Sequence, residues 1–163
     1  MPSILIACTA NICRSPMAEA MLKRLVSTRP DAEQWHIESA GTWADCGSPS
    51  APLSQLVMKR MGMDISTHQS QPVSSDLIKR FDLILTMEHH HKEGLKSVFK
   101  QYSDRIFLIS EMIGLEEDIS DPIGGDLEDY KETARKLARI LTDGLDRIYQ
   151  LAMFQRTTPS NDP

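Results

Sequence analysis

The sequence has few cysteines and no long apolar run. Its 163 residues include only Cys8, Cys13 and Cys46, a low and odd count that does not suit the disulfide framework of a small secreted protein. No apolar run approaches the ~20 residues that a transmembrane helix requires, and residues 1–7 lack the basic segment that opens a signal peptide. We therefore expect a cytoplasmic protein without a membrane span, in which the thiols matter for their reactivity.

The sequence also has fewer basic than acidic residues. The chain carries 18 Lys and Arg residues against 23 Asp and Glu residues, a net charge of -5. A nucleic-acid-binding protein usually shows a basic patch, so the composition argues against a nucleic-acid partner and leaves room for a local positive pocket. The length predicts one domain over residues 1–154, followed by a polar tail at 155–163; it assigns no oligomeric state.

Hydrophobic patterning predicts strands that alternate with helices. We expect strands at 3–7, 35–39, 83–87 and 105–109, and helices at 17–27, 53–61, 74–79, 88–99 and 130–149. This alternation predicts an α/β fold with three layers, α/β/α, around a four-stranded parallel sheet. Ligands of such sheets bind beyond the carboxyl ends of the strands, so the loops after the first and fourth strands are expected near the site.

The loop after the first strand carries the strongest motif. Cys8 is followed, after five residues, by Arg14 and then by Ser15 and Pro16, where we expect a helix to begin with Ser15 as its cap. A strand–loop–helix turn points backbone N–H groups inward, and the helix dipole adds positive charge, which makes an anion site. Arg14 adds a bidentate fork for phosphate oxygens. The motif predicts a phosphate-binding loop after strand 1, with these further members: Thr9, Ala10, Asn11, Ile12 and Cys13.

The same positive field favours the thiolate form of Cys8, which is a strong nucleophile. The transition state of phosphoryl transfer spreads charge over three equatorial oxygens, at which the loop amides and Arg14 are aimed. Ser15 can donate a hydrogen bond to the thiolate. An isolated cysteine at a strand end would more often be an inert core residue, but the arginine at this spacing favours the catalytic interpretation.

The motif Cys-x5-Arg-Ser-Pro near the N-terminus resembles that of the low-molecular-weight protein tyrosine phosphatases. The resemblance extends over nearly the whole chain: residues 39–42 look like the second-strand motif of the family, 65–73 look like the segment that supplies its buried His68, and Asp121 with Pro122 matches its general-acid loop. It implies a four-stranded parallel sheet, a phosphocysteine intermediate, and no metal or other cofactor. The implied partner is a phosphorylated protein or a small phosphomonoester.

Asp121 is the candidate general acid. The leaving group needs a proton, and the water that attacks phosphocysteine must lose one, so a single carboxyl group can do both in turn. Asp-Pro is also a common turn signal, and Asp118 and Asp126 are local competitors. The resemblance favours Asp121 over them.

The resemblance also implies a polar network that supports the phosphate loop, formed by Asn11, Ser15, Ser39 and His68. For Cys13 two interpretations stay open. The resemblance implies that it can form a reversible, inactivating disulfide with Cys8, as in a redox sensor, but it could equally be a small packing residue.

Three consecutive histidines, 89–91, invite a metal site. Adjacent residues at the start of a helix point in different directions, and no cysteine or carboxylate partner is suggested by spacing. We expect a solvated helix face and no metal.

The sequence departs from the family pattern after the Asp-Pro pair. Aromatic residues that wall the phosphotyrosine slot are replaced by Ile123, Gly124 and Gly125, so Trp43 is the remaining candidate for an aromatic wall. This pattern looks like a bacterial branch that includes protein arginine phosphatases, which typically have threonine where this chain has Ile12. Because an apolar Ile12 suits a flat ring better than a charged guanidinium, phosphotyrosine is the predicted substrate and phosphoarginine the alternative.

Two further alternatives are less favoured. An arsenate reductase relays oxidation through additional cysteines, and only Cys46 lies outside the loop. A non-catalytic phosphate-binding module would be attractive if Cys8 or Asp121 were absent, and both are present.

Overall fold

The protein is built around one parallel sheet in the computed structural model, which describes residues 1–157. The strands are β1 (Ser3–Cys8), β2 (His36–Gly41), β3 (Leu83–Thr86) and β4 (Ile106–Leu108). They pair in the order β2-β1-β3-β4, and every pairing is parallel. The predicted fold class is therefore confirmed.

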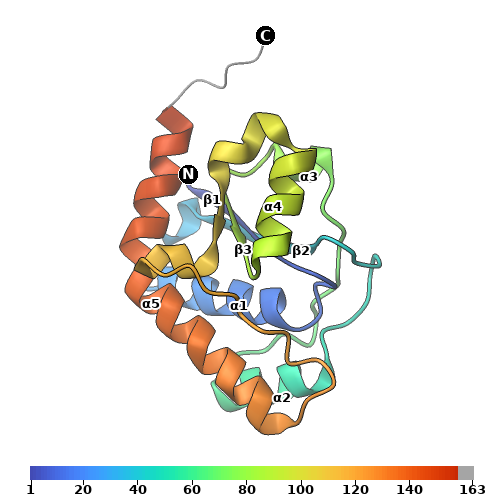
Figure 1. Cartoon of the computed structure of the whole chain (residues 1–163). Helices are drawn as coiled ribbons and strands as arrows, with labels where there is room; N and C mark the ends of the chain where they lie inside the picture. The colour runs from blue at the N-terminus through green and yellow to red at the C-terminus, as the bar shows by residue number, and fades with distance from the viewer. Residues whose placement is uncertain (158–163) are drawn as a thin grey trace.

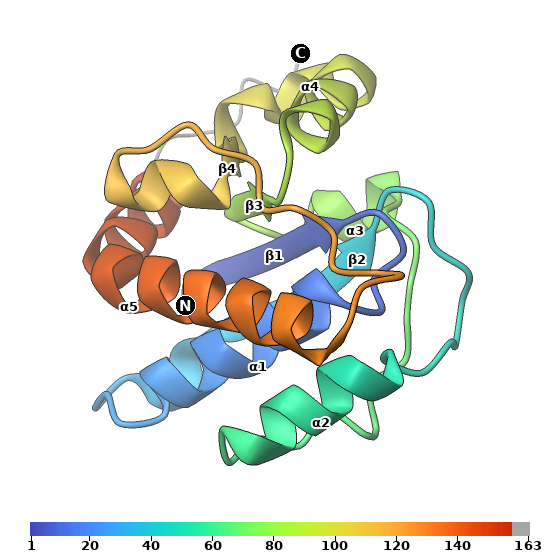
Figure 2. The ribbon, with the colours of Figure 1, turned by 60° about the horizontal axis from the view of Figure 1, so that its bottom comes forward.

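Helices cover both faces of the sheet (Figures 1 and 2). One face is covered by α1 (Arg14–Val26), α2 (Pro52–Arg60) and α5 (Leu127–Thr157), and the other by α3 (Ser75–Ile78) and α4 (His89–Val98). Short 3-10 helices are found at η1 (Ala32–Gln34), η2 (Lys100–Arg105) and η3 (Ile109–Ile113).

The apolar side chains of β1 pack on both faces of the sheet. Ile4 and Ile6 pack into the core under α1 and α5, whereas Leu5 and Ala7 face the smaller core under α3 and α4. Successive side chains of a strand point to opposite faces, so a strand covered on both faces must be apolar at every position. This explains why β1 shows no alternation in its sequence.

The strand order reverses between β1 and β3. The chain moves from β1 to β2 on one side and then returns to place β3 on the other side of β1. Such a reversal in strand order is where α/β sheets bind ligands. The segment before α5 crosses this edge, next to the loop that follows β1 (Figure 2).

The helix after the phosphate loop begins earlier than predicted. We expected Ser15 to cap it, but α1 begins at Arg14, and its N-cap is Cys13, for which no side-chain capping bond is found in the described residues. The Ser15 hydroxyl is used elsewhere in the loop. The free amides of the first turn are thus left for an anion.

The terminal helix is much longer than predicted. The expected helix ended at residue 149 and the polar tail began at 155, yet α5 runs to Thr157. Its last turns are held by tertiary contacts: Ala152 is fully buried, and the Gln155 side chain donates to the carbonyl of Asp104 at 3.0 Å. Residues 158–163 of the expected tail lie outside the described residues.

We expect a chain that ends at Tyr149 to lose about 2 kcal/mol or more of its free energy of unfolding. The truncation exposes the apolar surface that Ala152 and its neighbours cover and removes the Gln155 hydrogen bond. Urea unfolding measures the loss, and a chain that ends at Thr157 is the matched control. Equal stability of the two chains would show that the final turns of α5 contribute nothing.

Candidate active site

The phosphate loop contains a residue in an unusual backbone conformation. Asn11 has a φ of 57°, in the left-handed region that non-glycine residues rarely adopt. Its side-chain amide donates to Ser15 Oγ at 2.8 Å and to Ser39 Oγ at 2.9 Å, and its Oδ1 accepts the backbone N–H of Gln71 at 2.9 Å. His68 Nε2 lies 2.7 Å from the Asn11 carbonyl and must donate to it. Contacts from three segments therefore hold the strained residue.

The loop also requires a glycine beside it. A Cβ added to Gly41 would lie 2.4 Å from the carbonyl oxygen of Thr9. The next two residues then bind the loop through their backbones: Thr42 N–H donates to Cys8 O at 2.8 Å, and Trp43 N–H donates to Thr9 O at 2.9 Å. The Trp43 side chain is 86% exposed, so a ring stands free next to the phosphate loop.

The candidate nucleophile is buried against a hydroxyl group. Cys8 is 3% exposed, and its Sγ lies 3.0 Å from Ser15 Oγ. Because Ser15 Oγ already accepts a hydrogen bond from Asn11, its own hydrogen is free to point at the sulfur. Ser15 is therefore placed to donate a hydrogen bond to the sulfur of Cys8.

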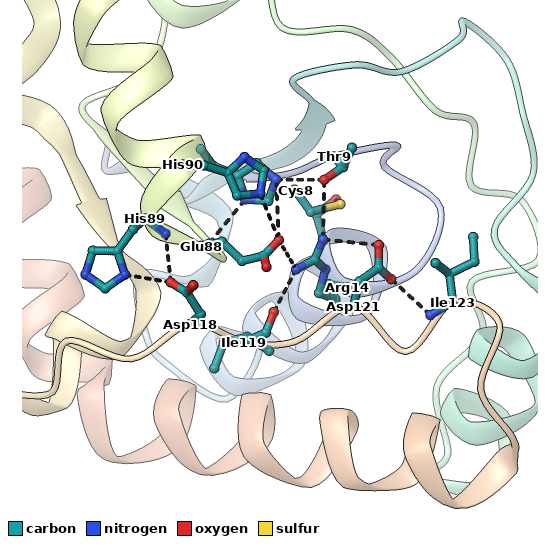
Figure 3. A network of polar contacts seen from close by, with 12 residues as sticks. Cys8, Thr9, Arg14, Glu88, His89, His90, Asp118, Ile119, Asp121 and Ile123 are labelled. Atoms are coloured by element: carbon teal, nitrogen blue, oxygen red, sulfur yellow. Dashed lines mark hydrogen bonds and ion pairs between the residues drawn. The ribbon is translucent and has the colours of Figure 1, made fainter.

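Arg14 is buried, and its guanidinium is held along one edge (Figure 3). Its Nη1 donates to Glu88 Oε2 at 2.8 Å and to the carbonyl of Ile119 at 2.7 Å. The side chain is 1% exposed, so these partners satisfy a charge that water cannot reach.

The other edge of the guanidinium has donors that the described residues leave unpaired or only weakly paired. Within residues 1–157, the buried Nε of Arg14 has no hydrogen-bond partner. Nη2 makes only long contacts, at 3.4 Å to Thr9 Oγ1 and 3.3 Å to Asp121 Oδ2. The Nε and Nη2 donors form the planar fork that binds two oxygens of a phosphate, and an unpaired buried donor is costly unless a ligand completes it.

Asp121 is the candidate acid that reaches this fork. One of its oxygens lies by Arg14, and the other accepts the backbone N–H of Ile123 at 3.1 Å. Asp118 instead contacts His89 at 2.7 Å, and Asp126 accepts the N–H of Asp129 at the start of α5. Geometry thus separates three carboxyl groups that local sequence could not.

The two remaining loop residues take up different surroundings. Ala10 is half-buried. Ile12 packs its side chain against the main core and accepts the N–H of Ala51 through its carbonyl at 2.8 Å.

Known proteins share this arrangement across nearly the whole chain. Residues 3–150 match the family model described as low molecular weight phosphotyrosine protein phosphatase. The chain belongs to this family.

Individual relatives include both protein tyrosine phosphatases and protein arginine phosphatases. A probable low molecular weight protein-tyrosine-phosphatase, EpsP, of Ralstonia nicotianae is 34% identical over 149 residues, which cover 91% of this chain and 97% of that protein. A protein-arginine-phosphatase of Bacillus subtilis is 34% identical over 141 residues, covering 85% and 91%. The crystal structure of the low molecular weight protein tyrosine phosphatase from T. tengcongensis matches with a TM-score of 0.85 and 36% identity, covering 90% of this chain and 99% of that one.

As a member of the low molecular weight phosphatase family, the protein is a cysteine-dependent protein phosphatase, a hydrolase that acts on phosphorylated proteins. The four-stranded parallel sheet with a phosphate loop after its first strand is the fold of these enzymes.

In this phosphatase the Cys13 side chain contacts α5. Its Sγ lies 3.6 Å from the hydroxyl of Tyr130. Burial raises the pKa of the Cys13 thiol, and the hydrogen bond with Tyr130 only partly offsets this effect. Cys8 and Cys13 are both free thiols, and a disulfide between them stays a prediction.

The histidine run of the phosphatase was wrongly predicted to be a solvated face. His89 and His90 are exposed, but His91 is 1% exposed, with its Nε2 2.7 Å from Thr9 Oγ1. A helix turns by about 100° per residue, so one histidine of three faces the phosphate loop.

Sequence reasoning also missed Glu88, the ion-pair partner of Arg14. Burial would raise the pKa of Glu88, but the hydrogen bond and charge of Arg14 outweigh it and hold the pKa below its usual value. Glu88 lies two residues after the end of β3, at the carboxyl edge where ligands of this fold bind. That position, next to β1 in the sheet, is the signal that could have found it.

Of the described residues, Glu88, His90 and His91 have ligand atoms close enough to hold a metal ion. Two features oppose this use. The Arg14 cation already occupies Glu88 Oε2. His91 Nδ1 accepts the backbone N–H of Glu88 at 3.2 Å, so the ring proton is on Nε2, where a metal would have to bind. The cluster is better described as part of the hydrogen-bond network around Arg14.

We expect His91 to make folding stability depend on pH. Burial, followed by the charges of His90 and Arg14, lowers the pKa of His91 to about 4, below its ordinary 6.5. As the pH falls the unfolded chain takes up a proton first, so the contribution is complete above about pH 6.5 and is lost toward pH 4.

Urea unfolding at about pH 7 and about pH 4.5 tests this expectation. His91→Asn should lose roughly 2 kcal/mol less than the unsubstituted protein between these two conditions. An identical loss in both proteins would contradict the buried, neutral state of His91.

Proposed function

We propose that this phosphatase hydrolyses phosphotyrosine in proteins through a phosphocysteine formed on Cys8. The observation that carries the proposal is the unpaired, buried Nε of Arg14, next to the uncapped first turn of α1 and the sulfur of Cys8. Together they supply donors for the phosphate oxygens and a nucleophile for the phosphorus atom.

The first step is binding and attack. The dianion takes the Nε and Nη2 donors of Arg14 and displaces the long contact with Asp121. The thiolate of Cys8 forms a sulfur–phosphorus bond while the phosphorus–oxygen bond to tyrosine breaks. Protonated Asp121 gives its proton to the departing phenolate oxygen.

The second step restores the enzyme. Asp121, now a carboxylate, takes a proton from water as its oxygen attacks the phosphocysteine, and inorganic phosphate is released. The electron pair of the breaking sulfur–phosphorus bond returns to Cys8, where the hydrogen bond from Ser15 stabilises the thiolate as it leaves.

Phosphoarginine is the second candidate substrate. One relative is a protein-arginine-phosphatase, and residues 121–125 lack the aromatic side chains that would wall a phosphotyrosine slot. The exposed ring of Trp43 favours phosphotyrosine because it offers apolar surface to a flat ring. Ile12 packs against the main core but is only half-buried, so the rest of its apolar surface is left for such a ring.

A cytoplasmic location is part of the proposal. Cys8, Cys13 and Cys46 are free thiols in the structure, which suits a reducing compartment. In the chain up to residue 157, no helix combines the length and apolarity of a membrane span.

We expect Cys8→Ser to abolish phosphate release and Asp121→Asn to slow it according to the leaving group. With a phosphotyrosine peptide, kcat should fall about 10²- to 10⁴-fold, because the phenolate needs a proton. With p-nitrophenyl phosphate the fall should be much smaller, since p-nitrophenolate leaves without one. Asp126→Asn, an exposed carboxylate on the same segment, is the control. Equal losses on both substrates would remove Asp121 from the role of acid.

The substrate is decided by kcat/KM on matched phosphotyrosine and phosphoarginine peptides. We expect the phosphotyrosine peptide to be preferred. Ile12→Thr should shift the ratio toward phosphoarginine by about tenfold or more, because it removes apolar contact with a ring. A wild-type preference for phosphoarginine would overturn this substrate assignment and leave the phosphocysteine chemistry intact.

A further inference from the structure

Glu88 and His91, at the start of α4, contact each other and also contact the phosphate loop. Two hydrogen bonds join Glu88 and His91: His91 Nδ1 accepts the backbone N–H of Glu88 at 3.2 Å, and the Glu88 carbonyl accepts the backbone N–H of His91 at 3.0 Å. The same two side chains reach the loop after β1. Glu88 Oε2 pairs with Arg14, and His91 Nε2 lies 2.7 Å from Thr9 Oγ1 (Figure 3 shows the Arg14 and Thr9 contacts).

The hydrogen bonds determine which ring nitrogen of His91 carries the proton. Nδ1 accepts a backbone N–H and so has no hydrogen, and the neutral ring must then donate from Nε2. The side chain has no exposed surface. His91 is therefore a donor with one orientation, aimed at Thr9.

Thr9 connects this donor to the arginine. Its Oγ1 lies 3.4 Å from Arg14 Nη2, on the edge of the guanidinium that we propose binds phosphate. Glu88 holds Nη1 on the opposite edge at 2.8 Å. Glu88 and His91 thus act on the two ends of the guanidinium, Glu88 directly and His91 through Thr9.

We propose that His91 is a positioning residue for phosphate binding, which acts through Thr9 to hold the Nη2 edge of Arg14 toward the substrate. The inference rests on the proposed role of Arg14 as the phosphate-binding residue. It adds a residue from outside both the phosphate loop and the acid loop. His91 does not touch the substrate.

The chemistry of the ring allows its two hydrogen bonds to be separated. His91→Asn places an oxygen near the position of Nδ1, so it retains the acceptor for the Glu88 N–H and loses the donor to Thr9. His91→Gln places an amide nitrogen near the position of Nε2, so it retains the donor and loses the acceptor. His36→Asn changes a half-exposed histidine at the start of β2, at the opposite edge of the sheet, and is the control.

The experiment measures kcat and KM on p-nitrophenyl phosphate, inhibition by inorganic phosphate, and the unfolding midpoint. We expect His91→Asn to lower kcat/KM about 10- to 100-fold and to weaken phosphate inhibition, because small displacements in a binding site are costly. His91→Gln should stay within about threefold of wild type in both while showing the lower midpoint of the two variants. His36→Asn should leave kcat/KM unchanged.

A double substitution tests whether the effect passes through Thr9. Thr9→Val removes the acceptor at similar volume. If His91 acts through it, adding His91→Asn to Thr9→Val lowers kcat/KM no further.

Three results would overturn the inference. The first is full activity and phosphate affinity in His91→Asn. The second is a loss of kcat/KM that is equal in His91→Asn and His91→Gln and follows the fall in their unfolding midpoints. The third is a further fall in kcat/KM when His91→Asn is added to Thr9→Val. Failure of the proposed function is distinguishable, because it would show as phosphatase activity in wild type that survives Cys8→Ser.

Discussion

The site depends on a guanidinium buried at the carboxyl edge of the sheet. Arg14 is almost inaccessible to water, and Glu88 and the carbonyl of Ile119 satisfy one edge of it. Such a buried pair adds little net stability, but removing one partner costs about 3–5 kcal/mol because the other charge is left unpaired. The ion pair with Glu88 matters here because it fixes the orientation of the Arg14 guanidinium. With Nη1 held, Nε is left without a partner among the described residues and is the donor that we propose binds the phosphate.

The phosphate loop cannot hold its shape alone. Asn11 adopts a left-handed conformation, and its contacts come from α1, from β2 and from the segment around His68 and Gln71. Gly41 lets β2 approach the loop closely enough for backbone bonds to form. The strain is therefore supported by parts of the chain far from the loop in sequence. Rigidity of this kind suits catalysis, which needs donors that are oriented before the charge develops.

Local patterns and tertiary contacts contributed differently to the candidate site. Cys8, Arg14 and Ser15 were predictable because they lie in one continuous motif between a strand and a helix. Asp121 was favoured over Asp118 and Asp126 only through a family resemblance, since the three are alike in local terms. Adjacent histidines were misread as solvated because sequence alone does not give the phase of a helix against its neighbours.

The sequence by itself determined the alternation of strands and helices, the apolar layers on both faces of β1, and the anion-binding turn, because each depends on residues close together in the chain. Only the tertiary structure brought Arg14 to Glu88, 74 residues away, and to Asp121, 107 residues away. Those meetings follow from the order β2-β1-β3-β4, which sets β3 beside β1. Hydrophobic periodicity says which side of a strand is buried, and it does not say which strand lies next to it.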